Sequence, residues 1–244
     1  ATNSSVVNQI NQGVGIVTYR GHGTHKEWRE GWSDDNTGFD SIQVNRLSCP
    51  VINPIVFSVA CKNARITMSH CLMESFTTKE NAAVAFWGAT EDSYTNSNDY
   101  LIKDIYKQIY NNGVYRIGDI NLAAQTNTIN FYSTPKNAIA NAMIYLWGGD
   151  PTLEIWTDNP NQFSSDNIEV IQNKDSVTIF VEDSVKCDIS LCSMEDLGLS
   201  YFQKVEGVSS YTFSRVDVPC YINVNKHNYI PYTFNKNVTI NSKI

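Results

Sequence analysis

Three runs of apolar residues in the first part of the chain have the pattern of strands that are buried on both faces. They span residues 13–20, 54–60 and 81–89. Each run is short, rich in β-branched or other apolar residues, and bounded by Gly, Pro or Asn, with no regular polar alternation. This pattern is typical of a parallel sheet covered by helices. We therefore predict an α/β sheet whose strands follow this order.

Helical spacing of apolar residues occurs before, between and after these predicted strands. In the segment 100–111, for example, Leu101, Ile102, Ile105 and Ile109 fall on one face, and Asn112-Gly113 follows as a stop signal. The same reasoning predicts helices over residues 4–12, 41–47, 68–79, 100–111, 118–126 and 137–147. Strands that alternate with helices in this way indicate a mostly parallel sheet flanked by helices.

The pattern changes after residue 156. Short strand-like runs then recur at regular spacing, separated by Asn, Asp, Gly and Pro, and no helical stretch interrupts them. The runs are residues 170–171, 176–181, 188–192, 201–205, 211–216, 221–224 and 237–240. This spacing is typical of a small all-β sandwich. We therefore predict two domains, an α/β domain over residues 1–156 and a β-sandwich over residues 157–244.

Composition narrows the classes of partner. The chain of 244 residues is 42% hydrophobic and 18% charged, with a formal net charge of −7. This acidic balance argues against nucleic acid and anionic membranes as partners. No stretch approaches the roughly 20 apolar residues of a membrane-spanning helix. Plentiful Asn, Thr, Ser and Tyr beside few Lys and Arg suit a secreted or cell-surface bacterial protein.

Two residues that could be catalytic follow the ends of the first two predicted strands. The first ends beside Gly21-His22-Gly23 and the second at Cys61. Because the carboxyl ends of parallel strands meet at one edge of a sheet, His22 and Cys61 are expected to lie close together. A thiolate attacks carbonyls well and an imidazole can protonate a leaving amine, so the pair suits nucleophilic catalysis. The amides of Gly23 and Cys61 would be placed to stabilise an oxyanion.

Several features allow another interpretation. A buried Cys is usually inert packing, and His22 alone could be a loop residue. A zinc site is a rival, built from His22, His25, Cys61, His70 and Cys71, although their spacings match no finger or metalloprotease pattern. Cys187 and Cys192 could form a local disulfide, whereas Cys49, Cys71 and Cys220 have the pattern of core residues.

The loop of residues 24–40 also has two interpretations. It carries Trp28 and the acidic run Asp34-Asp35-Asn36. Trp28 could be a wall of a substrate cleft or part of a solvated surface loop. The acidic run is most simply a solvated surface, but its oxygens could also ligate a structural calcium ion.

Motifs along residues 13–156 resemble the gingipain-type cysteine peptidases of the caspase-like clan. The matching pieces are residues 19–24 (YRGHGT) followed by Trp28, residues 58–63 (SVACKN), Cys71 and Glu74, residues 83–86 (AVAF), and residues 147–153 (WGGDPTL). Because these pieces occur in order over most of the predicted first domain, the resemblance is much more specific than a His–Cys pair. The all-β segment that follows is similar to the immunoglobulin-like domain of the same family.

The resemblance implies a function and a site. His22 would be the general acid and base, Cys61 the nucleophile, and Gly23 and Cys61 the source of the oxyanion-hole amides. Trp28 and Tyr94 would contact substrate, Tyr94 as an aromatic wall of the primary specificity pocket. The expected activity is cysteine endopeptidase, acting on proteins or peptides through a thioester acyl-enzyme. No cofactor would be required, although structural calcium is possible by resemblance.

One departure from the family pattern limits these implications. Family members carry a further N-terminal α/β half, which supplies a carboxylate that orients the catalytic His and an acid that selects a basic P1 residue. Neither can be assigned here, so a basic P1 preference stays open, and we expect the chain to bind its own N-terminal segment as a separate partner. Two alternatives are an inactive binding or adhesin module on a peptidase fold and a peptidase specialised in processing secretion signals.

Overall fold

The computed structural model describes residues 2–29, 38–50, 52–173, 176–181, 185–195, 198–214 and 220–234. The chain forms two compact units, Ala1–Thr157 and Asp158–Ile244.

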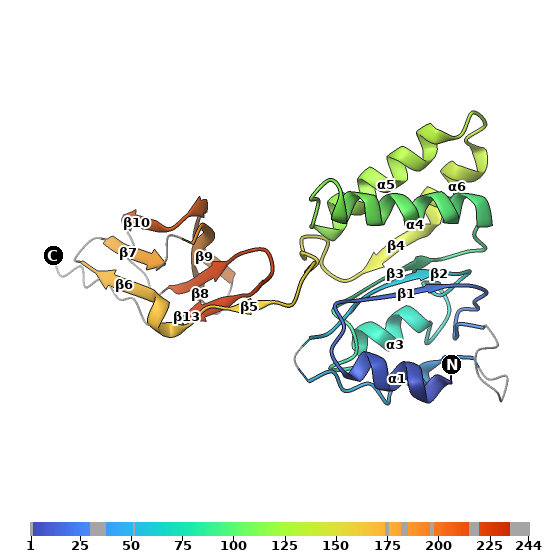
Figure 1. Cartoon of the computed structure of the whole chain (residues 1–244), viewed down its shortest axis with the longest axis horizontal. Helices are drawn as coiled ribbons and strands as arrows, with labels where there is room; N and C mark the ends of the chain where they lie inside the picture. The colour runs from blue at the N-terminus through green and yellow to red at the C-terminus, as the bar shows by residue number, and fades with distance from the viewer. Residues whose placement is uncertain are drawn as a thin grey trace. The chain divides into compact units, whose positions relative to one another are not determined.

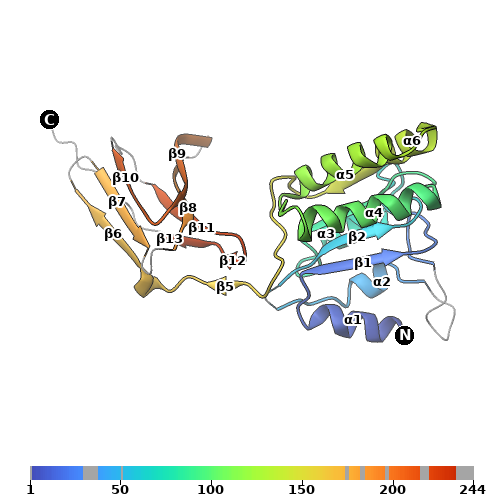
Figure 2. The ribbon, with the colours of Figure 1, turned by 45° about the horizontal axis from the view of Figure 1, so that its top comes forward.

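The first unit is built on a sheet of four strands in the order β1-β2-β3-β4. Strands β1 (Ile16–Arg20), β2 (Ile55–Val59) and β3 (Ala85–Ala89) are parallel, and β4 (Tyr145–Gly148) runs antiparallel to β3. Figures 1 and 2 show helices on both faces of the sheet. One face carries α1 (Asn3–Asn11), α2 (Ser41–Val44) and α3 (Leu72–Thr78), and the other carries α4 (Thr95–Tyr110), α5 (Ile117–Phe131) and α6 (Lys136–Ile144). The α/β architecture predicted from the sequence is confirmed.

Alternation along the central strands divides the apolar residues between two cores. Val56 and Phe86 pack with the helices of the α1 side, whereas Phe57 and Trp87, their sequence neighbours, pack with the α4 side. Successive side chains of a strand point to opposite faces, and every residue of β2 and β3 is buried. Full burial of one large apolar side chain stabilises the fold by about 1.5–3 kcal/mol. The unbroken apolar runs of the sequence therefore correspond to strands covered on both sides.

The prediction of one helix over residues 137–147 is wrong at its end. Helix α6 ends at Ile144, and the next four residues form the antiparallel strand β4. Tyr145 pairs with Ala89, and its ring stacks on Trp87 with centroids 4.1 Å apart. A continuous apolar run does not distinguish a helix from a buried strand. Here residues 145–148 form a strand because they pair with β3.

Two other helices begin at different residues from those expected. Helix α3 starts at Leu72 rather than at residue 68, because the Glu74 carboxylate accepts the Cys71 N–H at 3.0 Å and so caps the helix at Cys71. Helix α4 starts at Thr95 rather than at residue 100, which makes Tyr94 its N-cap residue instead of the middle of a loop.

The second unit contains two antiparallel sheets. One has the order β10-β7-β6 and the other β13-β11-β8-β9, and a short parallel pair joins β12 to β5. The strands are β5 (Asn161–Gln162), β6 (Ile168–Gln172), β7 (Ser176–Val181), β8 (Cys187–Glu195), β9 (Gly198–Val208), β10 (Ser210–Ser214), β11 (Tyr221–Asn225), β12 (Tyr229–Ile230) and β13 (Tyr232–Phe234), with a 3₁₀ turn at Ser165–Asn167. Residues of both larger sheets share one apolar core.

Two expectations about this unit have different outcomes. The local disulfide between Cys187 and Cys192 is wrong: both thiols are free, and both residues lie on β8, where a five-residue separation along an extended strand is too long for an S–S bond. The predicted strand over residues 237–240 lies outside the described residues.

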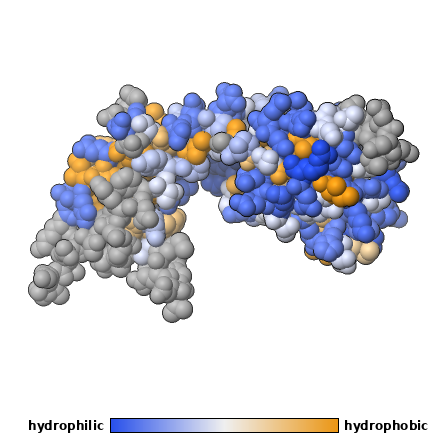
Figure 3. All heavy atoms as spheres, turned by 90° about the horizontal axis from the view of Figure 1, so that it is seen from below, coloured by the Kyte–Doolittle hydropathy of each residue, from blue (hydrophilic) through white to orange (hydrophobic). Residues whose placement is uncertain are grey.

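The surface of the described residues is mostly polar. In the face shown in Figure 3, hydrophilic side chains cover most of the first unit, and apolar ones form small separate patches. No helix among the described residues is long and apolar enough to cross a membrane.

Candidate active site

The register between β1 and β2 brings His22 and Cys61 to one end of the sheet. Arg20 is the partner of Val59 across the two parallel strands, and the Gly21 N–H donates to the Val59 carbonyl at 3.3 Å. Two residues further along each chain lie His22 and Cys61. Because the strands are parallel, both residues lie beyond the carboxyl end of the sheet, as the sequence predicts.

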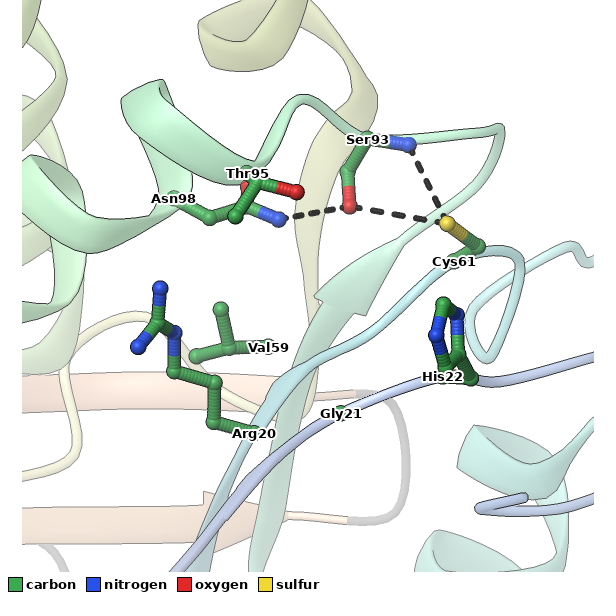
Figure 4. Close-up of a pocket in the computed structure, with 8 residues that line it drawn as sticks. All are labelled: Arg20, Gly21, His22, Val59, Cys61, Ser93, Thr95 and Asn98. Carbon is green, nitrogen blue, oxygen red and sulfur yellow. Dashed lines mark hydrogen bonds between the residues drawn. The ribbon is translucent and has the colours of Figure 1, made fainter. Parts of the chain in front are cut away.

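The backbone of His22 is fixed from two sides. Its carbonyl accepts a hydrogen bond from the Arg29 N–H at 2.8 Å and another from the Tyr19 hydroxyl at 2.7 Å. Figure 4 shows the imidazole pointing toward the side chain of Cys61. The loop after β1 therefore fixes the backbone from which the imidazole reaches the pocket.

The Cys61 thiol is the half-buried one among the cysteines of the first unit. The Ser93 N–H lies 3.4 Å from Sγ and the Ser93 hydroxyl 3.8 Å from it. Cys49 and Cys71 are buried instead, and burial raises the pKa of both thiols, which keeps them protonated and unreactive. Cys61 is thus the cysteine of this unit that is placed to react with a ligand.

A sharp turn follows Cys61. Lys62 has φ +63°, a left-handed conformation that costs a non-glycine residue roughly 1–2 kcal/mol. The Lys62 ammonium lies 2.7 Å from the Asp92 carboxylate, and this contact holds the pKa of Asp92 below its usual range, with a smaller contribution from Cys61. The N–H groups of Lys62 and Ala64 donate to the carbonyls of Glu91 and Ala89. These contacts turn the chain immediately after the thiol.

His22 and Cys61 both line a pocket of about 370 Å³. This volume falls in the range of small-molecule and peptide side-chain sites. The lining residues, drawn in Figure 4, are Arg20, Gly21, His22, Val59, Cys61, Ser93, Thr95 and Asn98. They come from the ends of β1 and β2 and from the start of α4.

A buried network of hydrogen bonds fixes the far wall of the pocket. The Asn98 Nδ2 donates to the Ser93 Oγ at 2.8 Å, and the Asn98 Oδ1 accepts from Asn141 Nδ2 at 2.7 Å and from the Tyr145 hydroxyl at 2.9 Å. Burial raises the pKa of Tyr145, so its hydroxyl stays protonated and donates. Ser93 is therefore held against the thiol by residues of α4, α6 and β4.

Position 23 requires a residue without a side chain. A Cβ there would lie 2.9 Å from the Ala60 Cβ and 2.9 Å from the Cys61 carbonyl oxygen, closer than real Cβ contacts. The loop after β1 can approach Cys61 this closely only because residue 23 is glycine. Within the described part of the chain, neither the Gly23 N–H nor the Cys61 N–H donates to another group.

Trp28 does not form the wall of the cleft that the sequence suggests. Its side chain is only 1% exposed, and its ring stacks on Tyr19 and Phe39. Its Nε1 donates to the buried Ser58 hydroxyl at 2.8 Å. A side chain buried this deeply supports the loop that carries His22 from beneath and does not touch a ligand in the pocket.

Asn63 connects the two loops of the site. Its Oδ1 accepts from the Ser58 hydroxyl at 2.7 Å, and its Nδ2 donates to the carbonyls of Thr24 and Glu27, the latter at 3.1 Å. The side chain is fully buried. Asn63 therefore ties the loop after β2 to the loop after β1.

Replacing Asn63 with alanine should destabilise the first unit by about 2–4 kcal/mol, because the buried Ser58 hydroxyl loses its acceptor and the Thr24 and Glu27 carbonyls each lose a donor. Thermal unfolding measured by circular dichroism should show a Tm lowered by about 5–15 °C. Asn45→Ala, at an exposed helix end, is the matched control and should change stability by less than about 0.5 kcal/mol. Equal Tm values for both variants would show that Asn63 does not hold the loops together.

Tyr94 lies beside the pocket but is not among its lining residues. Its side chain is 44% exposed, and its backbone N–H donates to the Asn141 Oδ1 at 2.9 Å. Its sequence neighbours Ser93 and Thr95 line the pocket instead. The assignment of Tyr94 as a wall of a specificity pocket stays a prediction.

Arg20, Ser93, Thr95 and Asn98 are pocket residues that the sequence reasoning did not single out. Arg20 belongs to the motif of residues 19–24, but the motif assigns it no function. Its position at the end of the first predicted strand, two residues before His22, is the sequence feature that could have indicated a place in the pocket. The other three residues carry no local pattern that distinguishes them from loop and helix-start residues.

The possible metal ligands do not assemble among the described residues. In that part of the chain no group of three or more His, Cys, Asp or Glu side chains could hold a metal ion. His25, His70 and Cys71 do not line the pocket that contains His22 and Cys61. The acidic run Asp34-Asp35-Asn36, considered for calcium, lies outside the described residues.

Comparison with known proteins shows which folds resemble that of this chain. No curated protein matches the chain. Its fold is similar to the Arg-specific cysteine proteinase gingipain R (RgpB), with a TM-score of 0.73 and 17% sequence identity. It is also similar to the complex of the pro- and mature domains of RgpB from Porphyromonas gingivalis, with a TM-score of 0.74 and 17% identity. These matches cover 96% of the chain but only 55% and 56% of those proteins, so it spans about half of their length.

The model of peptidase family C25 matches residues 1–156. That range contains the whole four-stranded sheet, the pocket, His22 and Cys61. The chain therefore belongs to peptidase family C25, the gingipain-type cysteine peptidases.

Proposed function

We propose that the protein is a cysteine endopeptidase in which Cys61 is the nucleophile and His22 the general acid and base. The observation that carries this proposal is the register of β1 and β2, which brings His22 and Cys61 to one pocket at the carboxyl end of the sheet. Family membership supplies the reaction class, peptide-bond hydrolysis, and the two side chains supply the chemistry that it needs.

In the acylation half of the reaction His22 takes the proton of the Cys61 thiol, and the resulting thiolate attacks the scissile carbonyl carbon. A C–S bond forms, and the carbonyl electron pair moves onto oxygen to give a tetrahedral oxyanion. When that pair returns, the C–N bond breaks, and His22 gives its proton to the departing amine. The products are a thioester on Cys61 and a free amine.

In the deacylation half a water molecule replaces the amine. His22 takes a proton from the water as its oxygen attacks the thioester carbon, and the C–S bond then breaks to release a carboxylic acid. The Gly23 and Cys61 N–H groups are proposed to stabilise the oxyanion in both halves. Their lack of another acceptor within the described residues supports this role.

The two proposed catalytic residues do not decide which charge is preferred in the P1 side chain of the substrate. The resemblance to gingipains raised a basic P1 residue as a possibility, and one of the similar structures is described as Arg-specific. Within the described residues, however, the pocket carries the cation Arg20. This side chain argues against a basic P1 residue, because two cations repel each other.

We further propose that the second unit is an immunoglobulin-like domain. Its two antiparallel sheets around one shared core support this classification. The resemblance to gingipains also supports a secreted or cell-surface location.

The edge of the sheet supplies a place for a partner. Among the residues that the structure describes, strand β1 is an outer strand of the four-stranded sheet, and no strand pairs with its other side. We propose that a separate N-terminal segment of the same protein pairs there and completes the catalytic domain. Mixing the two polypeptides should give a 1:1 complex on size-exclusion chromatography, and separate elution at micromolar concentrations would contradict it.

The function is tested by digesting an unbiased peptide library with the pure protein and identifying the new termini by mass spectrometry. Cleavage that depends on Cys61 is the expected result. Binding of peptides without any cleavage, with the N-terminal segment present, would instead identify a binding module on a peptidase fold.

A further inference from the structure

Arg20 occupies the part of the pocket away from the proposed dyad. It is the last residue of β1, and in Figure 4 its guanidinium extends across the pocket toward Asn98 and Thr95, while His22 and Cys61 lie on the other side. Val59 lies between these two ends, and Gly21 adds no side chain. The space that adjoins Cys61 therefore leads to the guanidinium.

The start of helix α4 adds to the positive potential of this end. The helix has 16 residues, and Thr95 and Asn98 in its first turn line the pocket. Its N-cap residue, Tyr94, provides no side-chain hydrogen bond. The first N–H groups of a helix carry a partial positive charge, so an uncapped start favours an anion nearby.

One carboxylate partly neutralises Arg20. Asp99 Oδ1 lies 3.4 Å from the guanidinium, but the other oxygen of Asp99 lies 2.7 Å from the Lys103 ammonium. The hydrogen bond from Lys103 is the main cause that holds the pKa of Asp99 below its usual range, and Arg20 contributes less. Two cations thus share one acid, and Asp99 itself is not a lining residue. The pocket keeps an excess of positive charge.

The other acids near the site have their own partners. Asp92 pairs with Lys62 at 2.7 Å and Glu91 with Arg65 at 3.1 Å. Among the lining residues that the structure describes, Arg20 carries the one permanent charge, and the rest are apolar, neutral polar, or the dyad itself. A guanidinium beside neutral donors matches a carboxylate and repels an ammonium or another guanidinium.

We propose that this pocket selects a substrate with an acidic side chain, Asp or Glu, at P1. The inference rests on the proposed function, because the dyad places the scissile carbonyl beside the pocket. The P1 side chain is attached one carbon away from that carbonyl and enters the adjoining space. Its carboxylate meets Arg20 and the start of α4. Arg20 is then the residue that determines specificity, and the enzyme prefers the opposite charge from an Arg-specific one.

The direct test is binding of peptides to the Cys61→Ala protein, which cannot cleave them. The peptides are blocked at both ends, so that no terminal carboxylate competes for Arg20, and they differ only in one central Asp, Asn or Arg. NMR titration should give tighter binding of the Asp peptide than of its Asn isostere by about tenfold, the effect of one charged hydrogen bond at a half-exposed site. The Arg peptide should bind more weakly than either.

Two variants in the Cys61→Ala background test the role of Arg20 in opposite directions. Arg20→Gln should abolish the preference for Asp over Asn, whereas Asp99→Asn, which removes the competing carboxylate, should increase it several-fold. Arg116→Gln is the matched control, because Arg116 is equally exposed and pairs with Glu154 but does not line the pocket. Circular dichroism checks that each variant is folded.

The outcomes separate this inference from the proposed function. Equal binding of Asp and Asn peptides, tighter binding of the Arg peptide, no binding of any peptide, or a preference that survives in Arg20→Gln would overturn the acidic specificity. If the wild type cleaves after Arg or Lys, the peptidase function stands and this inference fails. If the Asp preference is found but no peptide is cleaved by the wild type, the selectivity of the pocket for an acidic side chain stands and the proposed function fails.

Discussion

Replacing Cys61 with alanine should lower kcat/KM for the best peptide from the library by at least about 10³-fold, because it removes the atom that forms the acyl-enzyme. The residue lies in a half-buried position at a strand end, so a smaller side chain there should leave the fold intact. The measurement is the rate of cleavage of a fluorogenic version of that peptide, with Tm as a check on folding.

Cys192→Ala is the control for this experiment. Cys192 is a partly exposed free thiol in the second unit, so its loss changes the thiol content without touching the pocket. Wild-type rates are expected from this variant. Wild-type rates from a folded Cys61→Ala protein would refute Cys61 as the nucleophile.

Replacing His22 with alanine should lower kcat by about 10²- to 10⁴-fold, the usual contribution of a general acid and base. The carbonyl of residue 22, which holds the loop through Arg29 and Tyr19, is retained in the variant. Because the missing group is a small heterocycle, added imidazole should restore part of the rate, which a purely structural defect would not allow. Single-turnover kinetics with and without imidazole measure both effects.

The matched control is His70→Asn. His70 is exposed, does not line the pocket and has φ +60°, a conformation that Asn tolerates. It should behave as the wild type. Full activity in His22→Ala, or loss that imidazole does not relieve at any concentration, would contradict the role assigned to His22.

The sequence predicts the strands β1, β2 and β3 well because each of them is a short apolar run that can be recognised from its own residues. Strands β2 and β3 are buried on both faces, so every position is apolar or small and the runs are conspicuous. Because His22 and Cys61 follow the carboxyl ends of two parallel strands, the sequence alone predicts that they lie close together. Strand β4 could not be found in the same way, because Tyr145 and Trp147 continue the apolar pattern of α6 and only their pairing with β3 makes them a strand.

The environment of the site depends on contacts between distant residues. Ser93 and Asn98 reach Cys61 because α4 packs over the sheet, and Asn98 is fixed by Tyr145, 47 residues away in the chain. Trp28 is a second example. Its position in a polar loop suggests a wall of a substrate cleft, but its ring stacks inside the core. Such roles follow from packing, which no local pattern of the sequence records.

The central claim, that Cys61 is a peptidase nucleophile beside a substrate pocket, is tested most directly by covalent labelling. The protein is incubated with peptidyl acyloxymethyl ketones that carry Asp, Arg, Lys or Leu at P1, and its intact mass is measured. We predict a single adduct, mapped to Cys61 by peptide sequencing and absent in Cys61→Ala, that forms fastest with the Asp probe. An adduct on another cysteine, or no adduct with any probe, would contradict the claim.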